Sequence, residues 1–242
     1  MADATAYTIR RLGRVRAGGI TVPVTGSLNA VIKFDGPESE HCVYNELVAV
    51  RLAQTLHAPL ADGVLTLAGS GHAFASLELG APGLPLPDVP ESHHSRVAEL
   101  YPEAVAGLVA FDIWIGNPDR ARNFKASLVT PHVPVFRGFD HSHALLCVES
   151  TSARSLQRLR AGDLIAEAHP FYGRVRVEHL DRWVSRIKAL PEDYIRECCE
   201  FGRPIGAVTV RAQKALSQAL IQRRNKLVVI VQINLGTVRA IP

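Results

Sequence analysis

The sequence has no long hydrophobic run. A helix that crosses a membrane needs about 18 or more apolar residues in succession, and the longest apolar candidate, residues 227–233, is interrupted by Gln232. The N-terminal sequence MADATAYTIRRLG carries an early acidic residue and lacks the hydrophobic core of a secretory signal. We therefore expect no membrane span and a cytoplasmic protein.

Cysteine is scarce, and its spacing argues against two classes of protein. The four cysteines are Cys42, Cys147, Cys198 and Cys199, and no two of them form a C-x-x-C pair. Zinc ribbons use such pairs, and small secreted domains use larger frameworks of paired cysteines. We therefore expect reduced thiols, with neither a zinc ribbon nor a disulfide framework.

Motifs for hydrolysis are absent or weak. The sequence has no G-x-S-x-G motif, which argues against the nucleophile elbow of a serine hydrolase. A histidine-rich turn at Asp140, His141, Ser142 and His143, with His132 before it, is an alternative metal cluster for hydrolysis. The sequence also lacks internal repeats and low-complexity tracts.

The charge is modestly basic, with a formal net value of +4 at pH 7. Arginines recur at 10–16, 154–160 and 223–224. Such charge favours nucleotides or nucleic acid electrostatically. Dispersed surface charge is the simpler interpretation, and weak nucleic-acid contact through this basic surface stays open as an alternative.

The length and composition are those of a folded globular protein with a sizeable core. The chain has 242 residues, of which 47% are hydrophobic and 21% charged. The strongest linker signal is GAPGLPLPDVP, at residues 80–90. We predict a β-rich nucleotide-binding lobe at 1–80, a linker at 81–90, and a helical lobe at 91–242 that carries the catalytic and metal-binding loops.

The N-terminal lobe is predicted to be a small α+β unit with one main helix. The pattern predicts strands, a tight turn and a helix, in the order 6–15, 20–24, turn 25–29, 30–34, helix 38–56, 63–67 and 72–78. The last two strands are expected to form an antiparallel pair. Lys33 stands alone among apolar residues in AVIKF and could reach the phosphates of a nucleotide, although a surface lysine is the alternative. Glu46, on the helix, could hold Lys33 by an ion pair, or it could be a solvated glutamate.

The C-terminal lobe is predicted to be mostly helical. Apolar residues at helical spacing predict helices at 95–115, 155–165, 177–190, 191–201 and 208–224. Residues 227–233 are ambiguous between a final strand and a continuation of the last helix.

Polar side chains with catalytic potential are concentrated in two short loops. The first is FDIWIGNPDRARNFK, in which Asp119, Arg120, Arg122 and Asn123 follow a buried apolar segment. The second is VFRGFDHSHALL, with Asp140 on a turn after a strand-like run. An Asp, an Asn and a second Asp across a short hairpin are typical of phosphoryl-transfer enzymes that bind magnesium. The apolar flanks would hold these loops still, as catalysis requires.

Together these motifs resemble one known family, the HipA-like kinases of the protein-kinase-like superfamily, which also includes the phosphoinositide kinases. The resemblance spans roughly 22–146 and is carried by AVIKF (Lys33), YNELVAVRLAQTL (Glu46), IGNPDRARNF (Asp119, Asn123) and GFDHSHAL (Asp140). It implies a two-lobed protein-kinase-like α+β fold with an N-terminal antiparallel sheet lobe. It also implies an ATP- and Mg²⁺-dependent kinase, with a protein Ser or Thr as the expected acceptor and a lipid or small-molecule hydroxyl as the alternative.

The resemblance also implies a role for each motif residue. Lys33 would contact the ATP phosphates, Glu46 would orient Lys33, and Asp119 would align or deprotonate the acceptor hydroxyl. Asn123 and Asp140 would hold magnesium. The backbone of the hinge, residues 74–78 with Ser76, Leu77 and Glu78, would meet adenine, and the turn with Gly26 would approach the phosphates.

Two departures from the family pattern leave alternatives open. The interval from Asp119 to Asn123 is one residue shorter than usual, so the loop is contracted or Asn117 shares the task. Gly26 is the single glycine of its turn. The alternatives are a degenerate kinase that binds nucleotide without transferring phosphate, and a nucleic-acid-binding accessory protein. The positions of Arg120 and Arg122 should distinguish an enzyme from a regulator, because in an enzyme they are expected to face the phosphate and acceptor site, and in a regulator they need not.

Overall fold

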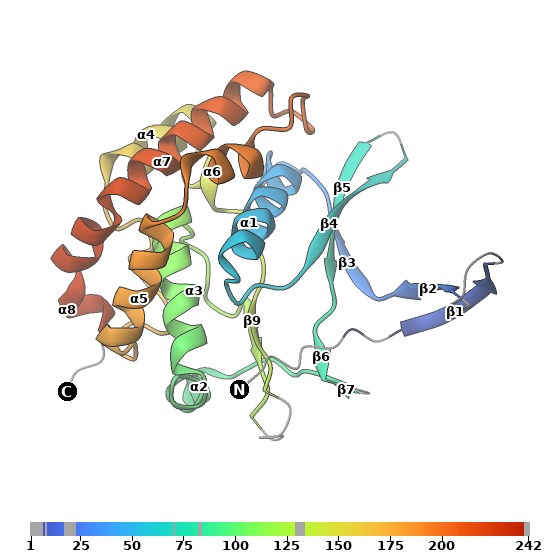
Figure 1. Cartoon of the computed structure of the whole chain (residues 1–242), viewed down its shortest axis with the longest axis horizontal. Coiled ribbons are helices and arrows are strands. Elements are labelled where there is room, and N and C mark those ends of the chain that lie inside the picture. The colour runs from blue at the N-terminus through green and yellow to red at the C-terminus, as the bar shows by residue number, and fades with distance from the viewer. Residues whose placement is uncertain are drawn as a thin grey trace.

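The computed structural model describes residues 7, 9–16, 23–69, 71–81, 84–128 and 134–239. The strands of the N-terminal part lie on one side of the molecule, and the helices of the C-terminal part lie on the other (Figure 1). This is the α+β arrangement predicted from the sequence, with an antiparallel sheet before a mostly helical region. None of the described helices is long and apolar enough to cross a membrane.

The central sheet has three antiparallel strands in the order β3, β5, β4. They are β3 (Ala30–Lys33), β4 (Gly63–Ala68) and β5 (Gly71–Leu77). Successive side chains of a strand point to opposite faces, and Lys33 lies opposite Phe74, which is buried. Lys33 therefore shares the face of the sheet that turns toward helix α1 (Cys42–Leu56). The predicted antiparallel pair β4–β5 is confirmed.

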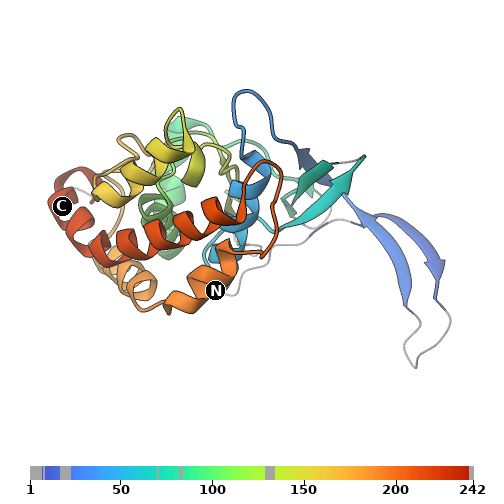
Figure 2. The same ribbon diagram turned by 90° about the horizontal axis from the view of Figure 1, so that it is seen from above.

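Strands β1 (Ile9–Val15) and β2 (Val24–Leu28) form a separate antiparallel ribbon that projects from the body (Figure 2). The tight turn predicted at 25–29 is therefore wrong: Gly26 lies inside β2, opposite Leu12. Two register irregularities in β1 place Ile9, Leu12 and Val15 opposite Leu28, Gly26 and Val24, on one face. The first predicted strand lies in β1 within the described residues, and residues 20–22 of the second lie outside them.

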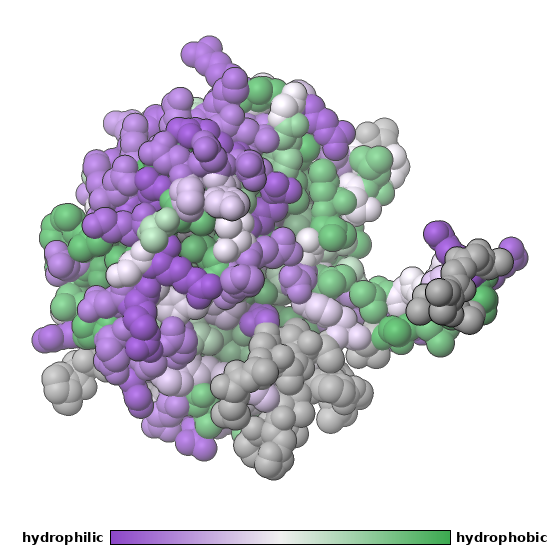
Figure 3. Space-filling model, viewed as in Figure 1, coloured by the Kyte–Doolittle hydropathy of each residue, from purple (hydrophilic) through white to green (hydrophobic). Residues whose placement is uncertain are grey.

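Exposed aliphatic side chains gather on the sheet side of the molecule. Figure 3 shows such residues over β4 and β5 and on the ribbon. Among the described residues, the large exposed apolar side chains of this part are Ile9, Leu12, Val15, Val24, Leu28, Val31, Ile32, Phe34, Val64 and Leu67. Single exposed apolar residues are ordinary, but this concentration marks a surface that a ligand or partner could cover.

The chain between the two regions forms a short strand pair and then turns into the helices. The pair is β6 (Gly80–Ala81) with β7 (Leu84–Pro85). A 3-10 turn at Glu91–His93 leads into α2 (His94–Leu100). This stretch contains most of the predicted linker.

Helix α3 (Pro102–Ile115) is the centre of the helical region. Apart from Glu103 and Asp112 it is apolar all round, and its residues from Val105 onward are buried, as expected for a helix covered on every side. It ends at Gly116, whose φ of 69° is the left-handed conformation that glycine adopts without strain. A side chain at Gly116 would also come within 2.9 Å of both Leu159 and Ile165.

The remaining helices are α4 (Ser152–Ala161), α5 (Val177–Lys188), α6 (Glu192–Cys199), α7 (Val210–Ile233) and α8 (Leu235–Val238), with a 3-10 turn at Leu145–Cys147. Of these helices, α5 and α7 pack against α3, and α4, α6 and α8 pack against α7. The ambiguous residues 227–233 continue α7 as a helix. The indole of Trp114 donates to the Leu220 carbonyl over 3.1 Å and joins α3 to α7.

A second hairpin holds the two polar loops. Strand β8 (Phe124–Ala126) pairs with β9 (Phe136–Gly138). Gly138 exchanges backbone hydrogen bonds of 2.8 Å with Pro59 and Ala61, which ties this hairpin to the chain between α1 and β4. The loop before β8 and the turn after β9 are therefore held at the junction of the two regions.

Candidate active site

Lys33 lies between two carboxylates. Its ammonium nitrogen is 2.5 Å from Glu46 Oε1 and 2.9 Å from Asp140 Oδ1. Burial alone would lower the pKa of Lys33, but the two carboxylates raise it above its ordinary value. The predicted ion pair with Glu46 is confirmed, and the lysine is charged and fixed in direction.

Glu46 is buried, with 2% of its surface exposed. Besides Lys33, it accepts from the backbone N–H of His141 over 2.9 Å, and its second oxygen lies 3.4 Å from His141 Nδ1. Burial raises the pKa of Glu46, but His141 and Lys33 outweigh that effect and lower the pKa below its ordinary value. Glu46 is therefore an anionic anchor for both Lys33 and the turn that carries Asp140.

Asp140 lies on a sharp turn after β9, with a φ of 61°. The hydroxyl and the backbone N–H of Ser142 donate to its Oδ1, over 2.8 and 3.3 Å. Burial raises the pKa of Asp140, but Lys33 and Ser142 hold it well below its usual range. Its contacts among the described residues all use Oδ1. The second oxygen of an ionised carboxylate is then free to bind a cation.

Asn123 and Asp140 are brought together by the hairpin. Phe124 pairs with Gly138, and the Phe139 N–H donates to the Asn123 carbonyl over 3.0 Å, so the two loops leave the hairpin side by side. The Asn123 amide nitrogen donates to the Asp119 carbonyl over 2.8 Å. This bond closes the short loop and leaves the amide oxygen of Asn123 as a possible metal ligand.

Asp119 is exposed at the start of this loop. Its N–H donates to Asn117 Oδ1 over 3.2 Å, and Asn117 is itself buried and donates to Asp112 over 3.0 Å. Asn117 therefore positions Asp119, and both polar atoms of its side chain are engaged within the protein. The expectation that Asn117 could share the metal is not supported by this geometry.

Arg120 is not where the sequence pattern placed it. It is fully buried and donates to Asp112 over 2.7 and 2.8 Å, so it does not face a phosphate or an acceptor. It also donates to the carbonyl groups of Asn123, over 2.7 Å, and Phe139. Arg120 thus joins the two loops that carry Asn123 and Asp140 to helix α3.

His141 completes a buried polar network that the sequence did not reveal. Its Nε2 lies 2.9 Å from Arg120 Nη2, which can only donate, so Nδ1 carries the ring proton toward Glu46. At the other end of the network, His169 Nε2 lies 3.1 Å from Asp112. The one sequence signal for this network was Asp112, an acidic residue inside an otherwise apolar helix.

The alternative histidine metal cluster is not supported. Both ring nitrogens of His141 face protein partners, and His132 lies outside the described residues. Within the described part of the chain, no three His, Cys, Asp or Glu residues are grouped so as to hold a metal ion. A magnesium site of the predicted kind needs only one or two protein oxygens, because phosphate and water supply the others.

Val31 is an exposed apolar residue beside Lys33 that the sequence analysis did not single out. It is two residues before Lys33 on β3 and so lies on the same face, where 56% of its surface is exposed. The period-two spacing from Lys33 could have identified it. An apolar side chain beside the lysine is suited to cover a flat aromatic base.

The predicted hinge residues lie at the end of the central strand. Ser76 pairs with Val31 and Gly63, and the Leu77 and Glu78 N–H groups donate to the Asp62 and Asn29 carbonyls, over 2.9 and 3.1 Å. These two donors are used within the protein. Gly26 lies in the projecting ribbon, apart from the network around Lys33.

No family model matches the sequence, and no curated protein matches it. Two solved structures are similar. One is HipA of Shewanella oneidensis MR-1, determined in a toxin–antitoxin complex with HipB and operator DNA; the other is the proinflammatory kinase CtkA of Helicobacter pylori. Each has a TM-score of 0.58 and 14% identity over 96% of this chain, which spans 66% of HipA and 96% of CtkA. The chain has the protein-kinase-like fold of HipA and CtkA.

Proposed function

We propose that this protein binds ATP with Mg²⁺ at the junction of its two regions and transfers the γ-phosphoryl group to a hydroxyl. The observation that carries the proposal is the placement of the Lys33 ammonium 2.5 Å from Glu46 and 2.9 Å from Asp140. A lysine held by a buried carboxylate, with a second carboxylate beside it that can bind Mg²⁺, is the arrangement that kinases use for phosphoryl transfer from ATP.

The residues around Lys33 are suited to bind both Mg²⁺ and ATP. Mg²⁺ prefers oxygen ligands, and the second carboxylate oxygen of Asp140 and the amide oxygen of Asn123 lie on adjacent loops. When bound, the ion would neutralise charge on the transferred phosphoryl group. Lys33 would then exchange its contact with Asp140 for one with the phosphates, while Glu46 keeps its direction. Val31 would lie against the base.

Asp119 would bind the hydroxyl group of the acceptor. It is exposed, and its backbone is fixed by Asn117 and Asn123, so its carboxylate can align the attacking hydroxyl and accept its proton. The substrate that we favour is a protein Ser or Thr, and a lipid or small-molecule hydroxyl is the alternative. The cytoplasmic location and a weak nucleic-acid contact through basic residues such as those of β1 stay predictions.

One observation favours a second candidate, a kinase-fold regulator that binds nucleotide without transferring phosphate. The loop from Asp119 to Asn123 is short, and it is closed by the hydrogen bond from the Asn123 amide. A contracted loop could displace either residue from the geometry that transfer needs, since small misplacements are costly for catalysis. Nucleotide binding through Lys33 would be unaffected.

Thermal unfolding with ATP and Mg²⁺ tests the nucleotide site. A ligand that binds the folded state raises the melting temperature, and the rise should require both ATP and Mg²⁺. Lys33→Ala and Asp140→Asn should lose it, whereas Lys188→Ala, at the end of α5, should keep it. No rise in the wild type at millimolar ATP would overturn the proposal. A rise without phosphoryl transfer to any hydroxyl would select the regulator.

A further inference from the structure

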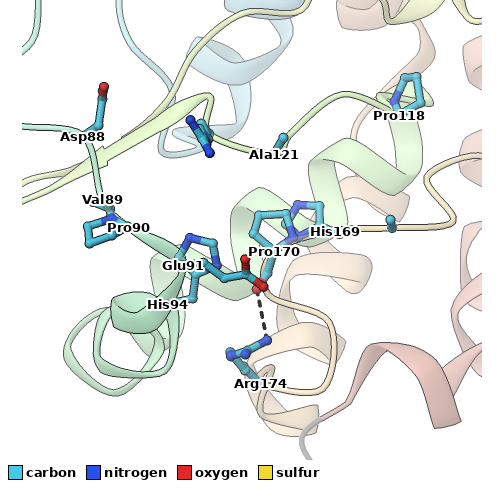
Figure 4. A pocket seen from close by; sticks show the side chains of 12 residues that line it. Asp88, Val89, Pro90, Glu91, His94, Pro118, Ala121, His169, Pro170 and Arg174 are labelled. Atoms are coloured by element: carbon cyan, nitrogen blue, oxygen red, sulfur yellow. Dashed lines mark hydrogen bonds between the residues drawn. The ribbon is translucent and has the colours of Figure 1, made fainter.

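A large cavity lies beside the proposed catalytic loop, residues 117–123, and away from Lys33. Its volume is about 680 Å³, which is within the usual range for a ligand site. Three segments line it: the end of the linker with α2, the loop around Asp119, and the loop before α5 (Figure 4). The lining residues that matter for recognition are His94, Pro118, Arg122, His169, Arg174 and Glu91.

The catalytic loop forms one wall of this cavity. Pro118 immediately precedes Asp119, and Ala121 and Arg122 follow in the same loop. Asp119 is not itself a lining residue, but it lies between Pro118 and Ala121, which are, so a molecule in the cavity lies beside the loop that carries the carboxylate proposed to receive the acceptor proton. The opposite wall contains His169, which is hydrogen-bonded to Asp112 and so belongs to the network that fixes the loop.

The lining holds two guanidinium groups and two carboxylates, but one of these carboxylates is already paired with a lysine outside the lining. Arg122 makes no ion pair among the described residues, and Arg174 donates only to the Ser95 hydroxyl and the carbonyl groups of Pro170 and Tyr172. Asp88 is paired with Lys125, which lowers its pKa, and the charge of Arg122 lowers the pKa further. Glu91 is the single acidic lining residue without an ion pair in the described structure, so the two guanidinium groups outnumber it.

His94 supplies an unsatisfied polar atom in the same wall. Its ring is 6% exposed and packs against Phe124 and Phe171, with centroids 5.4 and 5.7 Å away. Its Nε2 has no hydrogen-bond partner in the structure, although the ring does bond the Val89 backbone. A carbonyl can only accept, so Nδ1 carries the proton and Nε2 is an unused acceptor. Such buried atoms normally have a partner, and this one is enclosed in the wall beside the cavity.

We propose that this cavity holds the phosphoryl acceptor, and that the acceptor carries an anionic group next to its hydroxyl. The proposal rests on the proposed function. The hydroxyl oxygen would form a bond to the γ-phosphorus as the bond from that phosphorus to the β–γ bridging oxygen breaks. ADP would leave with the electron pair, and the hydroxyl proton would pass to Asp119. A carboxylate or phosphate on the acceptor would bind Arg122 and Arg174.

Two sources offer this chemistry, an acidic Ser or Thr peptide and a small hydroxylated acid. The first probe is a fluorescein-labelled peptide with one Ser between Glu residues, compared with the same peptide carrying Gln in place of Glu. The second is 3-phosphoglycerate. Binding is measured by fluorescence anisotropy for the peptides and by calorimetry for 3-phosphoglycerate, without nucleotide and at two salt concentrations.

The Glu peptide or 3-phosphoglycerate should bind, and Arg122→Ala should weaken that binding about tenfold or more, because a hydrogen bond to a charged group is lost. Arg96→Ala, on the same helix as His94 but outside the cavity, should have no effect. Because Arg122 is exposed, its variant is expected to fold.

The outcomes separate this inference from the proposed function. Failure of both anionic probes to bind, in a protein that Mg²⁺ and ATP stabilise, would overturn the acceptor inference alone. Equal binding of the Glu and Gln peptides, with no binding of 3-phosphoglycerate, would overturn it as well. Absence of any Mg²⁺- and ATP-dependent stabilisation would overturn the proposed function, whatever the anionic probes do.

Discussion

The guanidinium group of Arg120 donates to both carboxylate oxygens of Asp112, over 2.7 and 2.8 Å, and neither side chain is exposed. The same guanidinium holds the carbonyl groups of Asn123 and Phe139. The pair therefore does more than stabilise helix α3. It fixes the distance between the loop that carries Asn123 and the turn that carries Asp140.

Replacing Arg120 with Leu should therefore strongly lower the free energy of unfolding. Asp112 would be left charged and buried without its partner, which costs about 3–5 kcal/mol in comparable cases. Urea unfolding measures this loss as a change in the free energy of unfolding. The matched variant Arg122→Leu, two residues later but exposed, should change it by less than about 0.5 kcal/mol. Equal effects of the two variants would contradict the buried role of Arg120.

Acid should weaken the fold through Glu46. The pKa of Glu46 is lower in the folded protein than its ordinary value, because contacts with His141 and Lys33 outweigh burial. Its stabilisation is therefore fully present above the unfolded pKa, about 4.3, and is lost as the pH falls through the folded pKa. The free energy of unfolding of Glu46→Gln should fall less steeply below pH 5 than that of the wild type. Glu167→Gln, an exposed control, should keep the wild-type slope.

Close packing of α3 against α5 gives a third prediction. A Cβ atom at Gly107 would lie 2.6 Å from the Trp183 ring, so Gly107→Ala should force the two helices apart and cost about 1–3 kcal/mol. This loss should exceed the gain of about 1 kcal/mol that alanine brings to a helix. Gly236→Ala, in α8 with open space around it, should be neutral or stabilising. A stabilised Gly107→Ala variant in thermal unfolding would refute this packing.

Local pattern was enough to predict the elements that carry Lys33 and Glu46, and the order of the two later loops. Lys33 and Glu46 are each a charged residue inside a regular apolar pattern. The partners of Arg120 could not be predicted, because a buried arginine and an exposed one look alike in sequence. Only the fold decides that Arg120 meets Asp112.

The prediction for the β1–β2 ribbon was wrong for a different physical reason. Ile9, Leu12 and Val15 are spaced by three residues, and an ideal strand would place neighbours at that spacing on opposite faces. Register irregularities in β1 bring them to one face. The chain around Gly26 was interpreted as a turn because threonine, glycine, serine and asparagine are concentrated there, although it continues as a strand.

Substitutions at Asp119 and Asp140 should impair different steps, phosphoryl transfer in one case and ATP binding in the other. Asp140 touches Lys33 and is the proposed metal ligand, so Asp140→Asn should abolish Mg²⁺-dependent ATP binding. Asp119 has no contact with Lys33 among the described residues, so Asp119→Asn should retain ATP binding but lose phosphoryl transfer by about 10²-fold or more. Thermal shift and radiolabelled phosphate transfer measure the two effects. Full activity in both variants would contradict the assignment of this site.

Val31 and Ile32 provide a test of which face of the sheet the nucleotide uses. They are adjacent on β3 and similarly exposed, at 56% and 46%, but their side chains point to opposite faces. Val31→Asp would place a carboxylate next to Lys33 and the proposed base, and should weaken ATP binding by about tenfold or more through lost apolar contact and charge repulsion. Ile32→Asp should leave the affinity unchanged, since its side chain faces away from Lys33. Calorimetric titration with ATP and Mg²⁺ compares the two, and the reverse order of effects would place the base on the other face.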